Sequence, residues 1–342
     1  MRKKTTVTLK HMADELKLSI STVSRALSDH PDINQQTKEM VKKLASDWNY
    51  IPNIFAKGFR QHKTNVIGVI VPNITHYFTD TILRGILEEA AAQGYRVIIS
   101  ESNNNVAKQT EMLNTMLQFV DGILMSISKT TRNFDSILSV MDKVPLILFD
   151  KVSNKVPCSQ IVTNEEEAAF EAIEHLINIG KKRIAIIKEQ EHSYTSQRRF
   201  EGYLRALRAH NIAIDDKIIL SVDDISLKQG KRMANILLSL KKRPDAIFAI
   251  TDSAAIGVIQ TLNKFMIKIP EEIAVVGFSN SRHSTIIEPN STTVDQPGNL
   301  IGKTAVQYLI SELQSDADEL VLSNKTVEIK TNLIVRASTL KL

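Results

Sequence analysis

The sequence predicts an α/β protein with a small all-α headpiece, followed by two lobes built on doubly wound parallel sheets. Three observations support this prediction. Residues 8–50 contain three short helical patterns, the remainder alternates apolar strand-like runs with helical segments, and that alternation occurs as two similar series. The length of 342 residues also favours two to three domains.

Two short helices joined by a tight bend are predicted to open the headpiece. Thr8 stands in the N-cap position before an apolar-periodic run that ends near Lys17. The bend contains no glycine, so Leu16 or Lys17 must adopt the backbone conformation that turns the chain. The inward-facing residues of the run are Leu9, Met12, Ala13 and Leu16.

The second helix, expected over residues 19–27, buries Val23, Ala26 and Leu27 at helical spacing. Such a helix pair is typical of a helix-turn-helix, whose second helix enters the major groove of DNA. Hydroxyls and arginine on its outer face can reach base edges there. The outer face carries Ile20, Ser21, Thr22, Ser24 and Arg25.

A third helix is expected after the N-cap residue Asn34, and it ends before Pro52 because the position before proline disfavours α. A helical bundle without a role in DNA binding is the alternative, and charge argues against it. Residues 1–63 hold 12 Lys/Arg and 6 Asp/Glu, while the whole chain carries +5. The expected buried stripe is Met40, Val41, Leu44, Ala45 and Trp48.

Beyond a polar link at residues 61–65, continuous apolar runs predict parallel strands that are buried on both faces. The first series has strands at 65–71, 95–100, 122–127 and 145–150 and helices at 80–93, 106–119 and 134–141. The second has helices at 165–179, 196–210, 227–240 and 252–265 and strands at 183–188, 218–222, 246–250 and 273–278. An extended piece at 292–295, a helix at 300–313 and extended chain at 326–335 follow.

Composition excludes several classes of protein. The single cysteine, Cys158, rules out a disulfide framework and is expected to be a buried apolar residue. No apolar run approaches the roughly 20 residues of a membrane span, and no hydrophobic region follows the basic N-terminus. We therefore expect a cytoplasmic protein with no membrane association.

Motifs for catalysis and cofactor binding are absent from the sequence. It lacks a Gly-x-Gly pair, a P-loop, His-Glu-x-x-His and Gly-x-Ser-x-Gly, and its eight histidines show no metal-ligand spacing. We expect no enzymatic activity, no cofactor and no metal.

The headpiece motifs are Thr8-Leu9…Ala13, Ser19-x-x-Thr22-Val23-Ser24-Arg25, Asn49-Tyr50-x-Pro52-Asn53 and Ala56, and together they resemble the LacI/GalR family of bacterial transcriptional regulators. The resemblance covers nearly the whole chain and implies a periplasmic-binding-protein-like fold. It implies three crossovers, placed near Thr163, Thr293 and Leu322. The expected domains are a helix-turn-helix at 1–51, a hinge at 52–63 and an effector-binding and dimerisation domain at 64–342. Its N-lobe covers 64–162 and 294–322, and its C-lobe 163–292 and 323–342.

The resemblance also implies roles in DNA binding. In the family, paired hinge segments fold on operator DNA and insert an apolar wedge, usually leucine, into the minor groove; here Phe59 holds that position beside Gly58. Base contacts are expected from Ile20, Ser21, Arg25, Ala56 and Phe59. Phosphate contacts are expected from Thr8, Thr22, Ser24, Asn34, Thr37, Tyr50 and Asn53.

Candidate effector contacts lie at the carboxyl ends of strands and at the crossovers. Arg199 matches an arginine that binds effector hydroxyls or carboxylates in the family, while packing within the lobe explains one of the two rings Tyr77 and Phe78. Ser279 stands where many relatives carry an acid, so a ligand that is less hydroxyl-rich, negatively charged or seated differently stays open. The full candidate set is Asn73, Tyr77, Phe78, Asp150, Asn164, Arg199, Thr251, Asp252, Ser279 and Gln296.

The resemblance predicts a sequence-specific repressor that binds pseudo-palindromic operator DNA as a homodimer under the control of a small, carbohydrate-like effector. Whether that effector is an inducer or a corepressor stays open. A periplasmic solute-binding protein is disfavoured by the basic headpiece, and a sugar- or nucleoside-processing enzyme by the missing catalytic constellation.

Overall fold

The computed structural model describes residues 7–51, 63–190, 193–315 and 324–340, and the chain divides into two compact units, Met1–Thr64 and Asn65–Leu342. The first unit holds α1 (Leu9–Leu16), α2 (Ile20–Leu27) and α3 (Gln35–Asp47). Side chains cap all three helices, because Thr8, Ser19 and Asn34 each accept a hydrogen bond from a backbone N–H in the first turn. The predicted capping pattern of the headpiece is confirmed.

The headpiece core forms where the three helices meet. Its fully buried residues are Met12, Ala13, Val23, Ala26 and Val41, and Leu44, Ala45 and Trp48 pack against them. Lys17 takes the bend between α1 and α2 in the left-handed conformation, with φ of 52°. The prediction for Met40 was wrong: this side chain is 44% exposed, because it lies one residue, about 100° of helix rotation, away from Val41.

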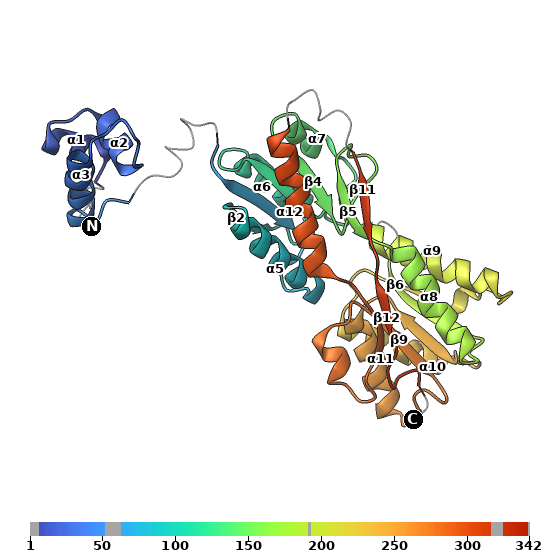
Figure 1. The fold of residues 1–342 in the computed structure, drawn as a ribbon. Helices are drawn as coiled ribbons and strands as arrows, with labels where there is room; N and C mark the ends of the chain where they lie inside the picture. The colour runs from blue at the N-terminus through green and yellow to red at the C-terminus, as the bar shows by residue number, and fades with distance from the viewer. Residues whose placement is uncertain (1–6, 52–62, 191–192, 316–323, 341–342) are drawn as a thin grey trace. The chain divides into compact units, whose positions relative to one another are not determined.

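The second unit contains two six-stranded sheets, each the centre of one lobe (Figure 1). Sheet A, in the N-lobe, is entirely parallel, in the order β11-β5-β4-β3-β1-β2. Its strands are β1 (Val66–Val71), β2 (Arg96–Glu101), β3 (Gly122–Met125), β4 (Leu146–Phe149), β5 (Gln160–Thr163) and β11 (Thr326–Ile329). Its helices are α5 (Tyr77–Ala92), α6 (Val106–Met116), α7 (Asp135–Met141) and α12 (Gly298–Gln314).

Sheet B, in the C-lobe, has the order β12-β10-β9-β8-β6-β7, and only β12 runs antiparallel to its neighbour. Its strands are β6 (Ile184–Glu189), β7 (Ile219–Val222), β8 (Ala246–Ala249), β9 (Ala274–Phe278), β10 (Thr292–Asp295) and β12 (Asn332–Ile334). Its helices are α8 (Glu165–Asn178), α9 (Tyr194–Ala209), α10 (Leu227–Ser239) and α11 (Asp252–Lys264). Short 3₁₀ turns at Asp216–Ile218 and Arg282–Thr285 complete the lobe.

Both faces of sheet A are covered, as the continuous apolar runs predicted. Alternate residues of β1 enter different cores: Ile67 and Val69 pack with α5 and α12, while Val66 and Ile70 pack with α6 and α7. The C-lobe has one large core that surrounds sheet B. The predicted α/β fold with two lobes of parallel strands is confirmed.

The chain passes between the lobes three times, after β5, after β10 and after β11. The first crossover lies at Thr163, as predicted, although the short strand β5 was not recognised in the sequence. The second follows Asp295, because β10 belongs wholly to sheet B; the boundary placed at residue 294 was wrong.

The predicted position of the third crossover, near Leu322, was also wrong. Strand β11 pairs in parallel with β5 in the N-lobe, so the chain returns to the C-lobe at residues 330–331 and not near Leu322. Figure 1 shows this terminal segment running from one sheet to the other. Residues 326–335 look like one extended run in the sequence, and only the choice of strand partners divides it.

Candidate functional site

The outer face of α2 is open, as the DNA-binding prediction requires. Ile20 is 40% exposed and the Arg25 side chain 49%, and the ion pair of Arg25 with Asp32 is long, at 3.9 Å. Ser19 Oγ lies 2.7 Å from Ser21 Oγ and 2.8 Å from the Thr22 hydroxyl, so these hydroxyls are arranged around the N-terminus of the helix. This face presents hydroxyls, one aliphatic group and one guanidinium.

Several predicted phosphate contacts lie at helix N-termini, where backbone N–H groups favour anions. Thr8 and Asn34 are the caps of α1 and α3, and the Thr37 amide donates to Asn34 Oδ1 at 2.8 Å. Ser24 is half-buried on α2, and burial raises the pKa of the half-buried Tyr50. Asn53, Ala56 and Phe59 lie outside the described residues.

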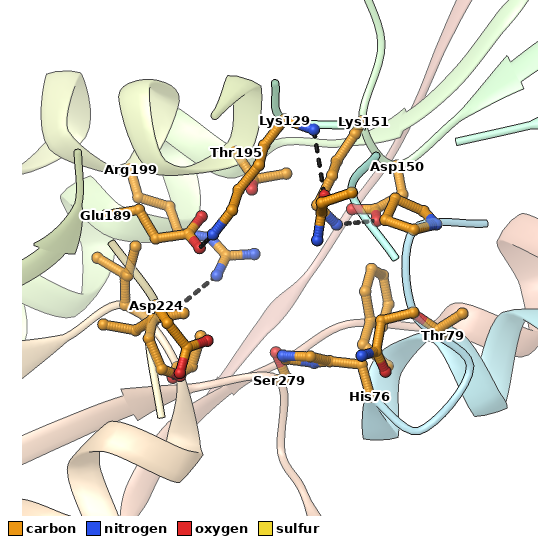
Figure 2. Close-up of a pocket in the computed structure, with 17 residues that line it drawn as sticks. His76, Thr79, Lys129, Asp150, Lys151, Glu189, Thr195, Arg199, Asp224 and Ser279 are labelled. Carbon is orange, nitrogen blue, oxygen red and sulfur yellow. Dashed lines mark hydrogen bonds and ion pairs between the residues drawn. The ribbon is translucent and has the colours of Figure 1, made fainter. Parts of the chain in front are cut away.

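The second unit contains a cleft of about 130 Å³, lined by side chains from both lobes (Figure 2). In the figure, Arg199, Glu189 and Asp224 line one side, and His76, Thr79 and Asp150 line the other. Most lining residues follow the carboxyl ends of strands. They are Pro72, Asn73, His76, Phe78, Thr79, Asn104, Lys129, Asp150, Lys151, Glu189, Thr195, Arg199, Asp224, Ile225, Ile250, Thr251 and Ser279. The cleft therefore lies at the position where doubly wound sheets bind ligands.

One ion pair crosses the cleft. Lys129 follows β3 in the N-lobe, and its Nζ lies 2.9 Å from Glu189 Oε1 at the end of β6 in the C-lobe. The same ammonium donates to the carbonyl oxygen of Asp223 at 2.6 Å. Both partners are mostly shielded from water, with 25% of the Lys129 side chain and 13% of the Glu189 side chain exposed. The lobes are therefore bound to each other at the cleft by a charged side chain.

Arg199 is held firmly at the wall of the cleft. The residue is 5% exposed, its Nε donates to Glu165 Oε2 at 2.5 Å, and an Nη1 hydrogen bond reaches the carbonyl oxygen of Ile250. The guanidinium carbon lies 3.6 Å from the centre of the Phe278 ring. Within the described part of the chain Nη2 donates no hydrogen bond, so one edge of the guanidinium is free to bind a ligand oxygen.

On the N-lobe side, Asp150 and Lys151 follow β4 and form an ion pair at 2.7 Å. Asp150 has a φ of 59°, which turns the chain sharply at the edge of the sheet. The Asp150 side chain is buried at 5% exposure, so its carboxylate is fixed beside the cleft by the neighbouring ammonium. The wall of the cavity thus carries both hydrogen-bond donors and acceptors.

The structure separates the candidate effector residues into two groups. Six line the cleft: Asn73, Phe78, Asp150, Arg199, Thr251 and Ser279. Tyr77, Asn164, Asp252 and Gln296 lie outside the lining.

Three of these four outer residues make defined contacts. Asn164 Oδ1 accepts from the backbone N–H and the hydroxyl of Thr331, each at 2.9 Å. Gln296 is 5% exposed and contacts Ser279. The cap of α11 is Thr251, and Asp252 instead accepts from Thr293 Oγ1 at 2.6 Å and from the Ser281 N–H at 2.5 Å. Burial raises the pKa of Asp252 to about 6.

Some lining residues were missed by the sequence analysis, above all Lys129, Lys151, Glu189 and Asp224. The same signal was available for all four, because each follows a predicted strand. Lys151 and Glu189 come directly after the strands predicted at 145–150 and 183–188, and Lys129 and Asp224 come two residues after those at 122–127 and 218–222. Cys158 is buried as expected, and burial raises the pKa of its thiol to about 12.

Within the described residues, no group of three or more His, Cys, Asp or Glu side chains is placed to hold a metal ion. The helices in that part of the chain are all too short or too polar to cross a membrane.

Comparison with known proteins agrees with the two parts of this fold. Residues 8–53 match the family of bacterial regulatory proteins, lacI family, and residues 173–339 match the periplasmic binding protein-like domain. The chain is 30% identical to the NTD biosynthesis operon regulator NtdR of Bacillus subtilis, over 97% of this chain and 99% of that protein. It is also 30% identical to catabolite control protein A of Priestia megaterium, with the same coverage.

The fold is also that of a solved structure, the lac repressor dimer bound to operator and the anti-inducer ONPF. The TM-score with the lac repressor is 0.85 at 24% identity, over 98% of this chain and 99% of that chain. A helix-turn-helix with an open recognition face and a two-lobed ligand fold are therefore present in one chain. The chain belongs to the LacI family of bacterial regulatory proteins and is a DNA-binding transcriptional regulator.

Proposed function

We propose that this regulator is a repressor that binds a pseudo-palindromic operator as a homodimer, and that a small, hydroxyl-rich effector in the cleft controls its affinity for DNA. The observation that carries the proposal is the cleft lined from both lobes, because a ligand held there contacts both of the bodies that the crossover segments connect. Such a ligand changes the free-energy difference between open and closed arrangements of the lobes.

The DNA-binding part of the proposal rests on α2. Arg25 offers a guanidinium that can donate two parallel hydrogen bonds to a guanine, while Ser21 and Ile20 reach neighbouring base edges. Thr8, Thr22, Ser24, Asn34, Thr37 and Tyr50 are proposed to hold phosphates, and Ala56, Phe59 and Asn53 are proposed to act from the segment outside the described residues.

Dimerisation follows from the size of the headpiece. A single module of this size buries too little surface for tight and specific binding, whereas a two-fold dimer reads two half-sites. The lac repressor, whose fold this chain shares, is a dimer on its operator.

The effector part rests on the chemistry of the cleft wall. Arg199 with its free edge, Asn73, Thr251 and the carboxylate of Asp150 together offer both donors and acceptors. Phe78 supplies an apolar surface against which a sugar ring can pack. We propose a carbohydrate or a derivative of one as the effector.

Selection from random duplexes with the full-length protein tests the DNA-binding proposal. We expect recovery of a sequence with two-fold symmetry, bound far more tightly than scrambled DNA at moderate ionic strength. Recovery of no preferred sequence would contradict it.

A thermal-shift screen of sugars, amino sugars, sugar phosphates and nucleosides tests the effector proposal, since a ligand of the folded state raises Tm. Compounds that raise Tm are then added to the operator-binding assay. Asn73→Ala should reduce the rise in Tm that a ligand causes. The matched change Asn114→Ala, at an exposed position of α6, should leave that rise unchanged. If every compound that raises Tm does so equally in Asn73→Ala and Asn114→Ala, the ligand does not bind at the proposed cleft site.

A further inference from the structure

The three crossover segments are joined by hydrogen bonds between buried and half-buried side chains. Asn164, at the first crossover, accepts two hydrogen bonds of 2.9 Å from Thr331 at the third. Gln296, at the second, donates to Glu165 Oε1 at 2.9 Å and to Thr163 Oγ1 at 3.3 Å, both at the first. Both later crossovers are therefore hydrogen-bonded to residues 163–165 of the first, and the Gln296, Glu165 and Thr163 side chains form a polar network.

This network is shielded from water and internally satisfied. Thr163, Glu165 and Gln296 are 4%, 3% and 5% exposed. Thr163 Oγ1 also donates to Glu165 Oε1 at 2.6 Å, so this carboxylate oxygen accepts two hydrogen bonds. Hydrogen bonds in such a dry environment are strong, and a donor or acceptor left without a partner there is costly.

The same residues reach the wall of the cleft. The second oxygen of Glu165 accepts from Arg199 Nε at 2.5 Å, and Gln296 Oε1 accepts from Ser279 Oγ at 2.9 Å. Arg199 and Ser279 both line the cavity. Ser279 has a φ of 104°, an unfavourable backbone conformation for a serine, and its hydroxyl is directed to Gln296.

We propose that Glu165 and Gln296 are positioning residues that tie the cleft wall to the crossovers and thereby set how far the lobes close. A ligand that moves Arg199 or Ser279 changes the hydrogen bonds of Glu165 or Gln296, whose other partners lie on the crossover segments. The network can adopt distinct arrangements of hydrogen bonds, because an amide or carboxylate that loses one partner must bind another. This inference rests on the proposed function in one respect, namely that a ligand in the cleft changes the hydrogen bonds of this network.

Distance measurements between the lobes by single-molecule energy transfer test the proposal without ligand or DNA. Dyes are attached to Asn114→Cys on α6 and Arg232→Cys on α10, both exposed positions, in full-length protein that carries Cys158→Ala. The labelled protein is mixed with an excess of unlabelled protein, so that a dimer rarely contains two labelled chains.

The informative variant is Gln296→Leu, which keeps a side chain of similar size and removes its hydrogen bonds. We expect a displaced and broader distribution of transfer efficiency. The matched control is Gln160→Leu, since Gln160 is also a buried glutamine, and its amide donates to the carbonyl oxygens of Ser153 and Val156 within the N-lobe alone. The control should lower Tm and leave the distribution unchanged. Equal distributions for the wild type and Gln296→Leu would overturn the proposal, as would an equal displacement in the control.

Ser279→Ala provides a measurement that does not depend on the folding of the leucine variant. It removes one oxygen at the cleft wall, and we expect a smaller displacement in the same direction. In the Gln296→Leu background the change should add nothing, because the shared hydrogen bond is already lost. Additive displacements would show that Ser279 acts independently of Gln296 and would refute the network. Because neither DNA nor effector is present, failure here leaves the proposed function standing, and failure of the operator or effector assays leaves these distances unaffected.

Discussion

The ammonium of Lys129 in the N-lobe lies 2.9 Å from the carboxylate of Glu189 in the C-lobe, and it also binds the carbonyl oxygen of Asp223. This contact crosses the cleft, on whose wall the polar network of Gln296 and Glu165 also ends. The two contacts differ in kind: one is a single, partly hydrated ion pair, and the other a buried hydrogen-bonded network.

Lys129→Met should therefore weaken the contact between the lobes. We expect a loss of about 1 kcal/mol in the free energy of unfolding, a value appropriate to a partly exposed ion pair with one added hydrogen bond. The difference from the wild type should shrink as salt is raised, because ions screen the pair. Urea denaturation at low and high ionic strength measures both effects. Lys143→Met, an exposed change in the same lobe, is the control; a loss that does not respond to salt would indicate altered packing instead.

Asp252 should make stability depend on pH. Burial raises the pKa of its carboxyl to about 6, whereas in the unfolded chain the value is about 3.9. Between these values the folded state holds a proton that the unfolded state has lost, so the stabilisation is complete below pH ~4 and disappears as pH rises through ~6. The difference of about two pKa units corresponds to about 3 kcal/mol.

Asp252→Asn carries no titrating group at this position. The free energy of unfolding of the wild type, minus that of the variant, should therefore fall between pH ~4 and ~7 by up to about 3 kcal/mol. Urea denaturation of both proteins across this range measures the difference. A difference that stays constant or rises with pH would contradict the assignment.

Arg25→Ala should weaken operator binding. If the exposed guanidinium reads a guanine, the loss is about 1–3 kcal/mol and is accompanied by relaxed specificity at one base pair of each half-site. The weak 3.9 Å contact with Asp32 does not restrain the side chain enough to prevent this. Fluorescence anisotropy on the selected operator and on operators altered at single base pairs measures it. Equal weakening on scrambled DNA would mean that Arg25 contacts phosphate only.

Gly85→Ala should disrupt the packing of α5 against α12. A Cβ at this position would lie 2.1 Å from the backbone oxygen of Asn299, so one helix must move. We expect a loss of about 3 kcal/mol or more in the free energy of unfolding. Gly68→Ala is the comparison, since its Cβ would meet the flexible thioether of Met116 at 2.7 Å. A smaller loss at Gly85 than at Gly68 would contradict the close helix contact.

Local sequence patterns predicted most of the secondary structure because the interactions that form it lie within a few residues. The caps Thr8 and Asn34 each accept a hydrogen bond from the amide three residues later. The strands were recognisable in the sequence because their apolar residues are continuous. The positions after strands likewise indicated Asn73, Asp150, Thr251 and Ser279, since parallel strands present their carboxyl ends at one edge of a sheet.

The sequence by itself therefore determined the headpiece, the alternation of strands and helices, and the edge of the sheets at which the cleft forms. Only the tertiary structure decided the strand partner of β11, the ion pair of Lys129 with Glu189 and the contact of Asn164 with Thr331. Each joins residues that are between 60 and 167 positions apart. No local pattern predicts such a pairing, because it depends on how the chain crosses three times between the two sheets.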